Sequence, residues 1–248
     1  MSQIERSEIE MQIEGCVAFV SGANRGVGAC FVEKLLEQGA RKVYAGARDI
    51  RALDSRDPRV VPVELDITNA EHVARAAAIA EDANLLVNNA GINRLEPALA
   101  AIDLSAARDE MEVNYFGTLN MIRAFAPSLR VSGGAIVNVS SILARVTLPS
   151  MASLCASKAA ALRMTEGVRA ELAPYGVRVL SILPAAIDTD MSRDFPPPKI
   201  TAAEVVEAVF AALREGDDEV YVGTMAKQIA SGLAADRRAV QASLAGVA

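Results

Sequence analysis

Residues 16–39 read "CVAFVSGANRGVGACFVEKLLEQG" and set the pattern that the rest of the chain repeats. The first seven residues are almost all apolar and rich in valine, which predicts a buried strand. Residues 25–38 then carry apolar side chains at helical spacing, and Gly39 supplies a helix stop signal. Between strand and helix lies "SGANRGVG" (21–28), whose glycines permit a tight turn and a close approach to a pyrophosphate at the helix N-terminus. On its own, this G-x-x-x-G-x-G spacing fits an ordinary tight turn as well as it fits a pyrophosphate-binding loop.

The same alternation of apolar strands and amphipathic helices continues along the whole chain. We expect six further strands, at residues 42–47, 60–65, 84–89, 134–140, 177–183 and 219–223. Helical spacing predicts a helix capped by Asn69 that runs to about residue 80, and helices at about 105–126, 150–172 and 201–214. Apolar strands that are each followed by a helix indicate an α/β fold, a doubly wound parallel sheet with helices on both faces. Without a repeat or linker, residues 1–248 form one domain, with an N-terminal extension (1–12) and a helical tail (224–248).

Composition and charge exclude several classes of protein. The chain has 248 residues, a net charge of −6 and a pI near 5.0, which argues against a nucleic-acid partner. Cys16, Cys30 and Cys155 lack metal-ligand spacing, and His72 is the only histidine, so we expect no metal site. The charged N-terminus has no signal-peptide core, and no apolar run is long enough to span a membrane. These features predict a cytoplasmic protein with no membrane partner.

Four further motifs follow "SGANRGVG" along the chain. They are "NNAG" (88–91), Asn114 in "VNYFG", "NVSS" (138–141) and "SKAA" (157–160). In order and spacing the set resembles the classical short-chain dehydrogenases/reductases, from about residue 13 to the tail. The resemblance implies a single Rossmann-type domain with a seven-stranded parallel sheet, and an oxidoreductase that uses a nicotinamide cofactor.

The resemblance also implies roles in cofactor binding. Three glycines would shape the phosphate loop, Asp66 would accept a hydrogen bond from the adenine amino group, and Ile187 and Thr189 would hold the nicotinamide carboxamide. Ala185 follows Pro184 where the family usually has glycine. The full expected set is Gly22, Asn24, Arg25, Gly26, Val27, Gly28, Arg48, Asp66, Ile67, Asn88, Ala90, Gly91, Lys158, Pro184, Ile187 and Thr189.

Two arginines bear on which nicotinamide cofactor is used. A 2′-phosphate requires cations near the end of the second strand and in the glycine loop, whereas a free 2′-hydroxyl favours a carboxylate at that strand end. Arg25 lies within the loop, and Arg48 follows the second strand, after Ala47 rather than an acid. Asp49, one position further, is the feature that would favour NAD(H). The pattern favours NADP(H).

The catalytic motif carries one departure from the family. The resemblance assigns Asn114 to a water-mediated proton relay, Ser141 to the substrate carbonyl and Lys158 to the nicotinamide ribose. A tyrosine would stand thirteen residues after that serine and one helical turn before the lysine, and Leu154 occupies this position. Leucine has no proton to donate, and a positioned general acid contributes about 10²–10⁴-fold in rate. Neither Cys155, rotated by about 100° along the helix, nor Tyr115 on the preceding helix is an obvious replacement.

Three functions remain open on these residues. The first is NADPH-dependent reduction of an imine that reacts as its iminium ion, which is already cationic and becomes a neutral amine without a proton from tyrosine. The second is ordinary carbonyl reduction in a chain that carries a tyrosine-to-leucine substitution at position 154, and the third is a pseudoenzyme that only binds NADP(H). The residues expected to border the substrate are mostly apolar, which predicts a hydrophobic small molecule: Ile92, Asn93, Ile142, Leu143, Leu148, Met151, Leu154, Ala186 and Met191. Helices 105–126 and 150–172 are those that the family pairs in homodimers or homotetramers.

Overall fold

A computed structural model of the chain describes residues 11–246. The strands are β1 (Val17–Ser21), β2 (Lys42–Ala47), β3 (Val60–Glu64), β4 (Leu85–Asn88), β5 (Ala135–Val139), β6 (Arg178–Pro184) and β7 (Glu219–Val222). The helices are α1 (Gly26–Glu37), α2 (Ala70–Ile79), α3 (Ser105–Met111), α4 (Thr118–Ser132), α5 (Ala152–Leu172), α6 (Ala202–Glu215), α7 (Thr224–Ala235) and α8 (Arg237–Ala245). All seven predicted strands form within two residues of the expected bounds.

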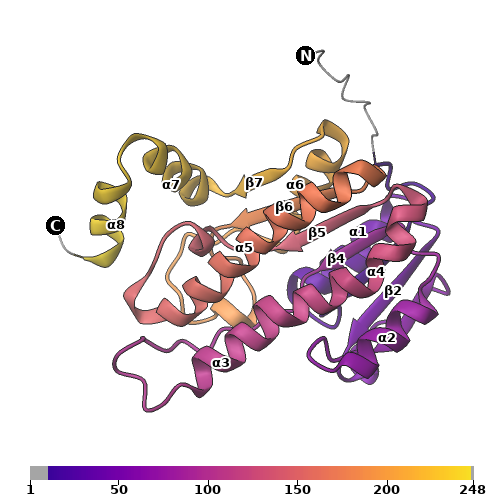
Figure 1. The fold of residues 1–248 in the computed structure, drawn as a ribbon, viewed down its shortest axis with the longest axis horizontal. Helices are drawn as coiled ribbons and strands as arrows, with labels where there is room; N and C mark the ends of the chain where they lie inside the picture. The colour runs from indigo at the N-terminus through magenta and orange to yellow at the C-terminus, as the bar shows by residue number, and fades with distance from the viewer. Residues whose placement is uncertain (1–10, 247–248) are drawn as a thin grey trace.

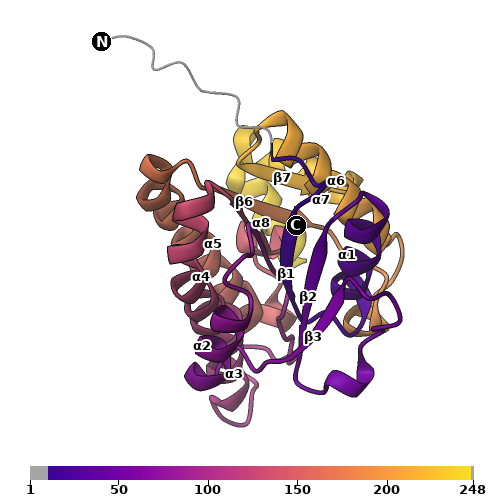
Figure 2. The ribbon, with the colours of Figure 1, turned by 90° about the vertical axis from the view of Figure 1, so that its right-hand side faces the viewer.

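The strands form one parallel sheet in the order β3-β2-β1-β4-β5-β6-β7. Helices α2, α4 and α5 cover one face, and α1 and α6 cover the other, as Figures 1 and 2 show. The chain crosses the sheet between β3 and β4, so the carboxyl ends of β1 and β4 lie side by side at a topological switch point, where open α/β sheets bind ligands. The predicted doubly wound fold is confirmed.

Each face of the sheet buries its own apolar core. On one face the Phe31 ring of α1 meets Phe210 of α6, edge to face, with centroids 6.5 Å apart. On the other face the Phe19 ring of β1 packs against the Phe125 ring of α4, with centroids 4.8 Å apart. A third, smaller cluster joins α7 and α8 to the segment after β5, through Ile142 and Val146. The C-terminal helices thus pack against a loop that follows the carboxyl edge of the sheet.

The helix predicted at residues 105–126 extends further than expected. Its helical run continues from α3 through a π-helical segment, Glu112–Gly117, into α4, which ends at Ser132. Pro127 lies inside α4, where a proline normally ends a helix because it lacks an N–H. Here the proline is exposed while Phe125 and Leu129 are fully buried on either side of it, so tertiary packing holds the helix together. Gly133, with φ of 61°, provides the actual end.

The ends of the chain are described in part. Residues 1–10 and 247–248 lie outside the described residues, and with them most of the predicted extension (1–12) and the last two residues of the predicted tail. Met11 and Ile13 are buried in the core that α1 and α6 cover. Helices α7 and α8 form where a helical tail was predicted. Among residues 11–246, no helix combines the length and apolar character needed to cross a membrane.

Candidate functional site

The glycine loop between β1 and α1 is packed against the end of β4. A Cβ atom on Gly28 would lie 2.1 Å from the Gly22 carbonyl oxygen, and one on Gly22 would lie 3.0 Å from Ala90 Cα. Only glycine fits at either position, because backbone occupies the space that a side chain would take. Asn24, Arg25 and Gly26 at the tip are exposed, while Val27 turns into the core. The loop therefore presents its backbone at the N-terminus of α1, as pyrophosphate binding requires.

Asn89 fastens this loop to the neighbouring strand. Its Nδ2 donates hydrogen bonds to the carbonyl oxygens of Ser21 and Gly22, each at 3.1 Å. Ser21 Oγ accepts in return from the backbone N–H groups of Asn89 and Ala90. The Asn88 side chain points elsewhere: it is buried and donates to Asn138 Oδ1 at 2.8 Å. Of the two asparagines in "NNAG", the second is thus the one bonded to the glycine loop, and sequence reasoning assigned it no role.

The segment after β6 closes over the other side of the loop. A Cβ atom on Gly26 would lie 3.2 Å from Thr189 Cγ2, so the glycine loop and this segment are in contact. Ile187 pairs with Ile200 in an isolated parallel bridge, and the Ser192 hydroxyl donates to the Ile187 carbonyl. Arg25 also reaches this segment, through an exposed 3.4 Å ion pair with Asp190. Ile187 and Thr189, predicted to hold the nicotinamide, are thereby fixed beside Gly26.

An arginine side chain without an ion-pair partner among the described residues lies at the end of the sheet near β2 and β3. Arg48 is exposed and has no ion-pair partner within residues 11–246. Asp49, whose carboxylate could have favoured a ribose hydroxyl, is instead held by Arg51 at 2.8 Å. Asp66 follows β3 beside the buried Ile67. Burial raises the pKa of Asp66, but hydrogen bonds from Thr68 and the charge of Arg48 bring it below its ordinary value.

The opposite end of the site gathers three of the predicted residues. A Cβ atom on Gly91 would lie 3.1 Å from Asn114 Oδ1 and 3.5 Å from Lys158 Nζ. Asn114 sits in the π-helical segment, a geometry that is frequent at functional sites because it turns a side chain out of the regular helix. Its amide accepts from the Ile92 N–H at 2.9 Å and donates to the Ile92 carbonyl at 3.0 Å. Asn114, Gly91 and Lys158 therefore form one constellation.

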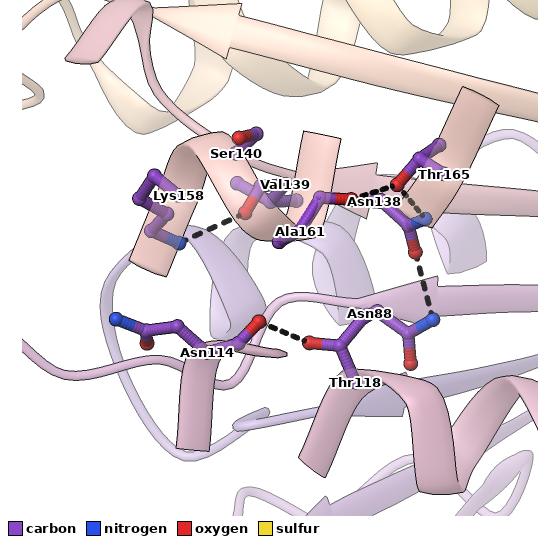
Figure 3. A pocket seen from close by; sticks show the side chains of 9 residues that line it. All are labelled: Asn88, Asn114, Thr118, Asn138, Val139, Ser140, Lys158, Ala161 and Thr165. Carbon is purple, nitrogen blue, oxygen red and sulfur yellow. Dashed lines mark hydrogen bonds between the residues drawn. The ribbon is translucent and has the colours of Figure 1, made fainter. Parts of the chain in front are cut away.

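Lys158 extends from α5 toward the carboxyl end of β5. Its Nζ lies 3.4 Å from the Val139 carbonyl oxygen, beside a small polar cavity that Figure 3 shows from close by. Burial lowers the pKa of Lys158 to about 8, and the charge of Glu110 opposes this shift. Buried amides and hydroxyls from β4, β5 and α5 hydrogen-bond around the same cavity, where Asn138 Nδ2 donates to Thr165 Oγ1 at 2.9 Å. The Lys158 ammonium therefore lies in a polar setting, with its pKa lowered from 10.5 to about 8.

Leu154 occupies the first turn of α5, one turn before Lys158, and is 6% exposed. The neighbouring Cys155 is turned away: its sulfur lies 3.5 Å from the Leu148 backbone nitrogen, and burial raises the pKa of the thiol. Tyr115 stacks edge to face on Phe116. Ser141 caps the turn at Ile142–Ala144, where its Oγ accepts from the Leu143 N–H at 3.2 Å. Cys155 is thus not placed to replace a tyrosine hydroxyl.

The residues predicted to border the substrate fall into three groups. Asn93 and Met151 meet directly, with the asparagine Nδ2 3.3 Å from the methionine sulfur. Ile142 and Leu143 pack with the C-terminal helices, as does Ala185. Ala186 and Met191 lie on the segment after Pro184, where the Ala186 carbonyl accepts from the Ile200 N–H and the Met191 side chain is 50% exposed. These groups come from the segments after β4, β5 and β6.

Two further residues of this site escaped sequence reasoning. Ser157 is fully buried, and its hydroxyl accepts from Asn114 Nδ2 at 3.0 Å. Glu110, one turn before Asn114, is also fully buried, and its Oε1 accepts from the Arg94 N–H at 2.7 Å. Ser157 had a signal in its place within "SKAA"; Glu110 reads as one more charge on an exposed helix.

Known proteins share both the sequence pattern and this geometry. Residues 16–199 match the family described as short chain dehydrogenase. A short chain dehydrogenase from Burkholderia cenocepacia J2315, solved in complex with NADP, is 68% identical, with a TM-score of 0.92 and coverage of 94% of this chain and 99% of that one. D-erythrulose reductase of Gallus gallus is 30% identical over 218 residues, 86% of this chain and 88% of that protein. Carbonyl reductase (NADPH) 2 of Sus scrofa is 32% identical over 189 residues, 75% of this chain and 77% of that protein. The chain belongs to the short-chain dehydrogenase family.

Proposed function

We propose that this protein is an NADPH-dependent oxidoreductase that reduces a hydrophobic C=N or C=O substrate without a tyrosine general acid. One observation supports the proposal: Leu154 is buried one helical turn before Lys158, and Lys158 Nζ and Asn114 Oδ1 lie 3.5 Å and 3.1 Å from the position that a Cβ would take on Gly91. A decayed site would have no reason to retain that arrangement. A cytoplasmic location belongs to the same proposal and is supported by the three cysteines, which are all free thiols.

The residues present fit an NADP(H) cofactor. Gly22 and Gly28 let the glycine loop pack closely on the end of β4 and present its backbone at the N-terminus of α1. Arg48, which has no ion-pair partner within residues 11–246, would complement the negative charge of a 2′-phosphate. The NADP complex of the Burkholderia cenocepacia relative supports the same cofactor here. Asp66 would face the adenine, the loop would hold the pyrophosphate, and Ile187 and Thr189 would hold the carboxamide. When bound, NADPH supplies the hydride for reduction.

The side chains then decide which acceptor is reduced readily. Lys158, charged below its pKa of about 8, would hold the nicotinamide ribose hydroxyls. Ser141 would orient a heteroatom of the substrate, and Asn114 would fix the backbone beside Gly91. An iminium carbon that accepts a hydride becomes a neutral amine and needs no proton. A ketone becomes an alkoxide, which requires a proton that Leu154 cannot give, so the site favours the iminium.

Carbonyl reduction is the second candidate, and the relatives favour it. D-erythrulose reductase and carbonyl reductase (NADPH) 2 are both named for carbonyl substrates. On this alternative, leucine replaces the tyrosine of an ordinary carbonyl reductase, and the residual rate would be lower by about 10²–10⁴-fold. A protein that binds NADP(H) without turnover is the third possibility.

Restoring the proton donor separates these functions. The wild-type protein, Leu154→Tyr and Leu154→Phe would each be assayed for NADPH oxidation with panels of cyclic imines and ketones. We expect wild type to reduce imines, and the tyrosine variant alone to gain ketone reduction by about 10²-fold or more. The phenylalanine variant controls for ring size without the hydroxyl. Wild-type turnover of ketones alone would favour the second candidate, and cofactor binding without any turnover the third.

Assembly through α4 and α5 completes the proposal. Both helices lie on the same face of the sheet (Figure 2), and exposed apolar side chains include Phe116 before α4 and Val131 within it. Ala156 on α5 is exposed and would permit close approach of a second copy. Light scattering of the purified protein would distinguish a homodimer or homotetramer from a monomer.

A further inference from the structure

Glu110 is a buried acid that the reaction as described does not use. It lies on α3, which packs against α5, and its side chain is fully buried. Its Oε1 accepts the Arg94 N–H at 2.7 Å, whereas its Oε2 is buried with no hydrogen-bond partner in the described part of the chain. Burying a carboxylate with half of its acceptors unused costs stability. A purely structural position would be filled better by an apolar residue.

The neighbourhood of Glu110 shows what the carboxylate holds. Glu110 and Asn114 are one helical turn apart and therefore project from the same side of the helical run. Asn114 bonds both the N–H and the carbonyl of Ile92, and Glu110 bonds the N–H of Arg94. Side chains from two successive helical turns thus hydrogen-bond to the backbone of Ile92 and Arg94, on either side of Asn93; we call these contacts the grip on residues 92–94. An outer ion pair, Arg94 with Asp109 at 2.7 Å, is half exposed and contributes little.

This grip determines where Asn93 stands. Between the two gripped residues, Asn93 is the one whose side chain faces Met151. Its Oδ1 accepts from the Leu95 N–H at 2.9 Å, and Leu95 has a φ of 56°, so the chain turns sharply away immediately after the segment. Without the Arg94 bond, little would restrain residues 93–95 except their own side chains.

We propose that Glu110 is a positioning residue that fixes residues 92–94 through its Oε1 and thereby aims Asn93 at the substrate. In this role Glu110 acts through its acceptor oxygen, while its charge acts separately by opposing the lowered pKa of Lys158. A glutamine, which keeps an acceptor oxygen at the same reach, should therefore serve in its place. The inference rests on the proposed function in one respect, that Asn93 borders the substrate.

Hydrogen exchange tests the grip without any substrate. In Glu110→Met the Arg94 amide loses its acceptor, and we expect it to exchange about fivefold faster, since a net hydrogen bond is worth roughly 1 kcal/mol. Glu110→Gln should keep the wild-type rate. Glu112→Met, an exposed acid in the same helical run, is the matched control. Because Glu110→Met could fail to fold, Glu110→Asp serves as a second variant; it keeps the charge but shortens the reach, and should also exchange faster.

Kinetics then test the consequence for the substrate. We expect Glu110→Met and Glu110→Asp to raise KM for the substrate about fivefold or more. In Glu110→Asp, which keeps the negative charge near Lys158, kcat and the Kd of NADPH should stay within about twofold of wild type. Glu110→Gln should restore KM. Unchanged Arg94 exchange in both impaired variants, an equal defect in the glutamine variant, or faster exchange with unchanged KM would each overturn the proposal. If wild type turned over no substrate, the proposed function would fail while the exchange data still decided the grip.

Discussion

Asn114 Nδ2 donates a hydrogen bond to Ser157 Oγ at 3.0 Å, and that hydroxyl donates in turn to the Leu154 carbonyl at 2.8 Å. Both side chains are buried, at 2% and 0% exposure. The pair ties the π-helical segment to the helix that carries Leu154 and Lys158. The position of Leu154 is thereby coupled to Asn114, which lies beside Gly91.

Removing this link should destabilise the protein. Ser157→Ala leaves one Asn114 N–H without its buried acceptor, which costs about 1–3 kcal/mol. We expect the free energy of unfolding, measured in urea, to fall by that amount. Ser153→Ala is the control on the same helix, because the Ser153 hydroxyl is buried without a hydrogen-bond partner in the described region. Equal losses in the two variants would show that the link contributes nothing specific.

Lys158 should impose a pH dependence on stability. Burial lowers its pKa from 10.5 to about 8, so between these values the unfolded chain binds the proton that the folded chain has released. Stability contributed by this residue therefore rises as the pH rises from about 8 to about 10.5, by at most about 3 kcal/mol, and is constant below pH 8.

The matched variant is Lys158→Met, which has no proton to lose. Urea unfolding of both proteins between pH 7 and pH 10 gives the difference between them as a function of pH. We expect the methionine variant to be the more stable at pH 7 and its advantage to shrink as the pH rises. A difference that does not change with pH would contradict a lowered lysine pKa.

Two glycines should respond in opposite directions to alanine. In Gly28→Ala the new Cβ would stand 2.1 Å from the Gly22 carbonyl oxygen, so the glycine loop must distort and we expect NADPH binding to be lost. Gly167, exposed on α5, has no atom within 4 Å of its Cβ position, and alanine there should stabilise the helix by about 0.5–1 kcal/mol. Calorimetric titration with NADPH and thermal unfolding measure the two effects. Retained NADPH affinity in Gly28→Ala would contradict the view that close packing of the glycine loop is needed for cofactor binding.

Cofactor choice should depend on Arg48. Arg48→Ala removes a cation that has no ion-pair partner among residues 11–246 and lies near the expected 2′-phosphate. We expect the Kd of NADPH to rise about tenfold or more while that of NADH changes little. Arg41→Ala is the control, because Arg41 is exposed and precedes β2, at the opposite end of that strand from Arg48. Fluorescence titration with both cofactors gives the four constants. If the two variants weakened NADPH binding equally, general charge and not a specific contact would be responsible.

Sequence alone determined the order of strands and helices and the chemistry expected of each motif. Apolar strands followed by amphipathic helices permit few arrangements, because parallel strands must be buried on both faces. The glycine loop, "NNAG" and "SKAA" are local patterns that can be recognised from the sequence without knowledge of the fold. The position of Leu154 relative to Lys158 follows from helical periodicity, since four residues make about one turn.

Tertiary structure decided what periodicity does not encode. The sequence predicted a helix end at about residue 126, but burial of Phe125 and Leu129 on the sheet carried α4 past Pro127 to Ser132. Asn89, rather than Asn88, is bonded to the glycine loop, because successive residues at a strand end point in different directions. From the sequence, Glu110 looks like a surface charge. In the structure α3 packs on α5, which buries Glu110 where its Oε1 accepts a hydrogen bond from the Arg94 N–H. Each outcome depends on contacts between residues distant in sequence, and such contacts form only when the sheet and its helices assemble.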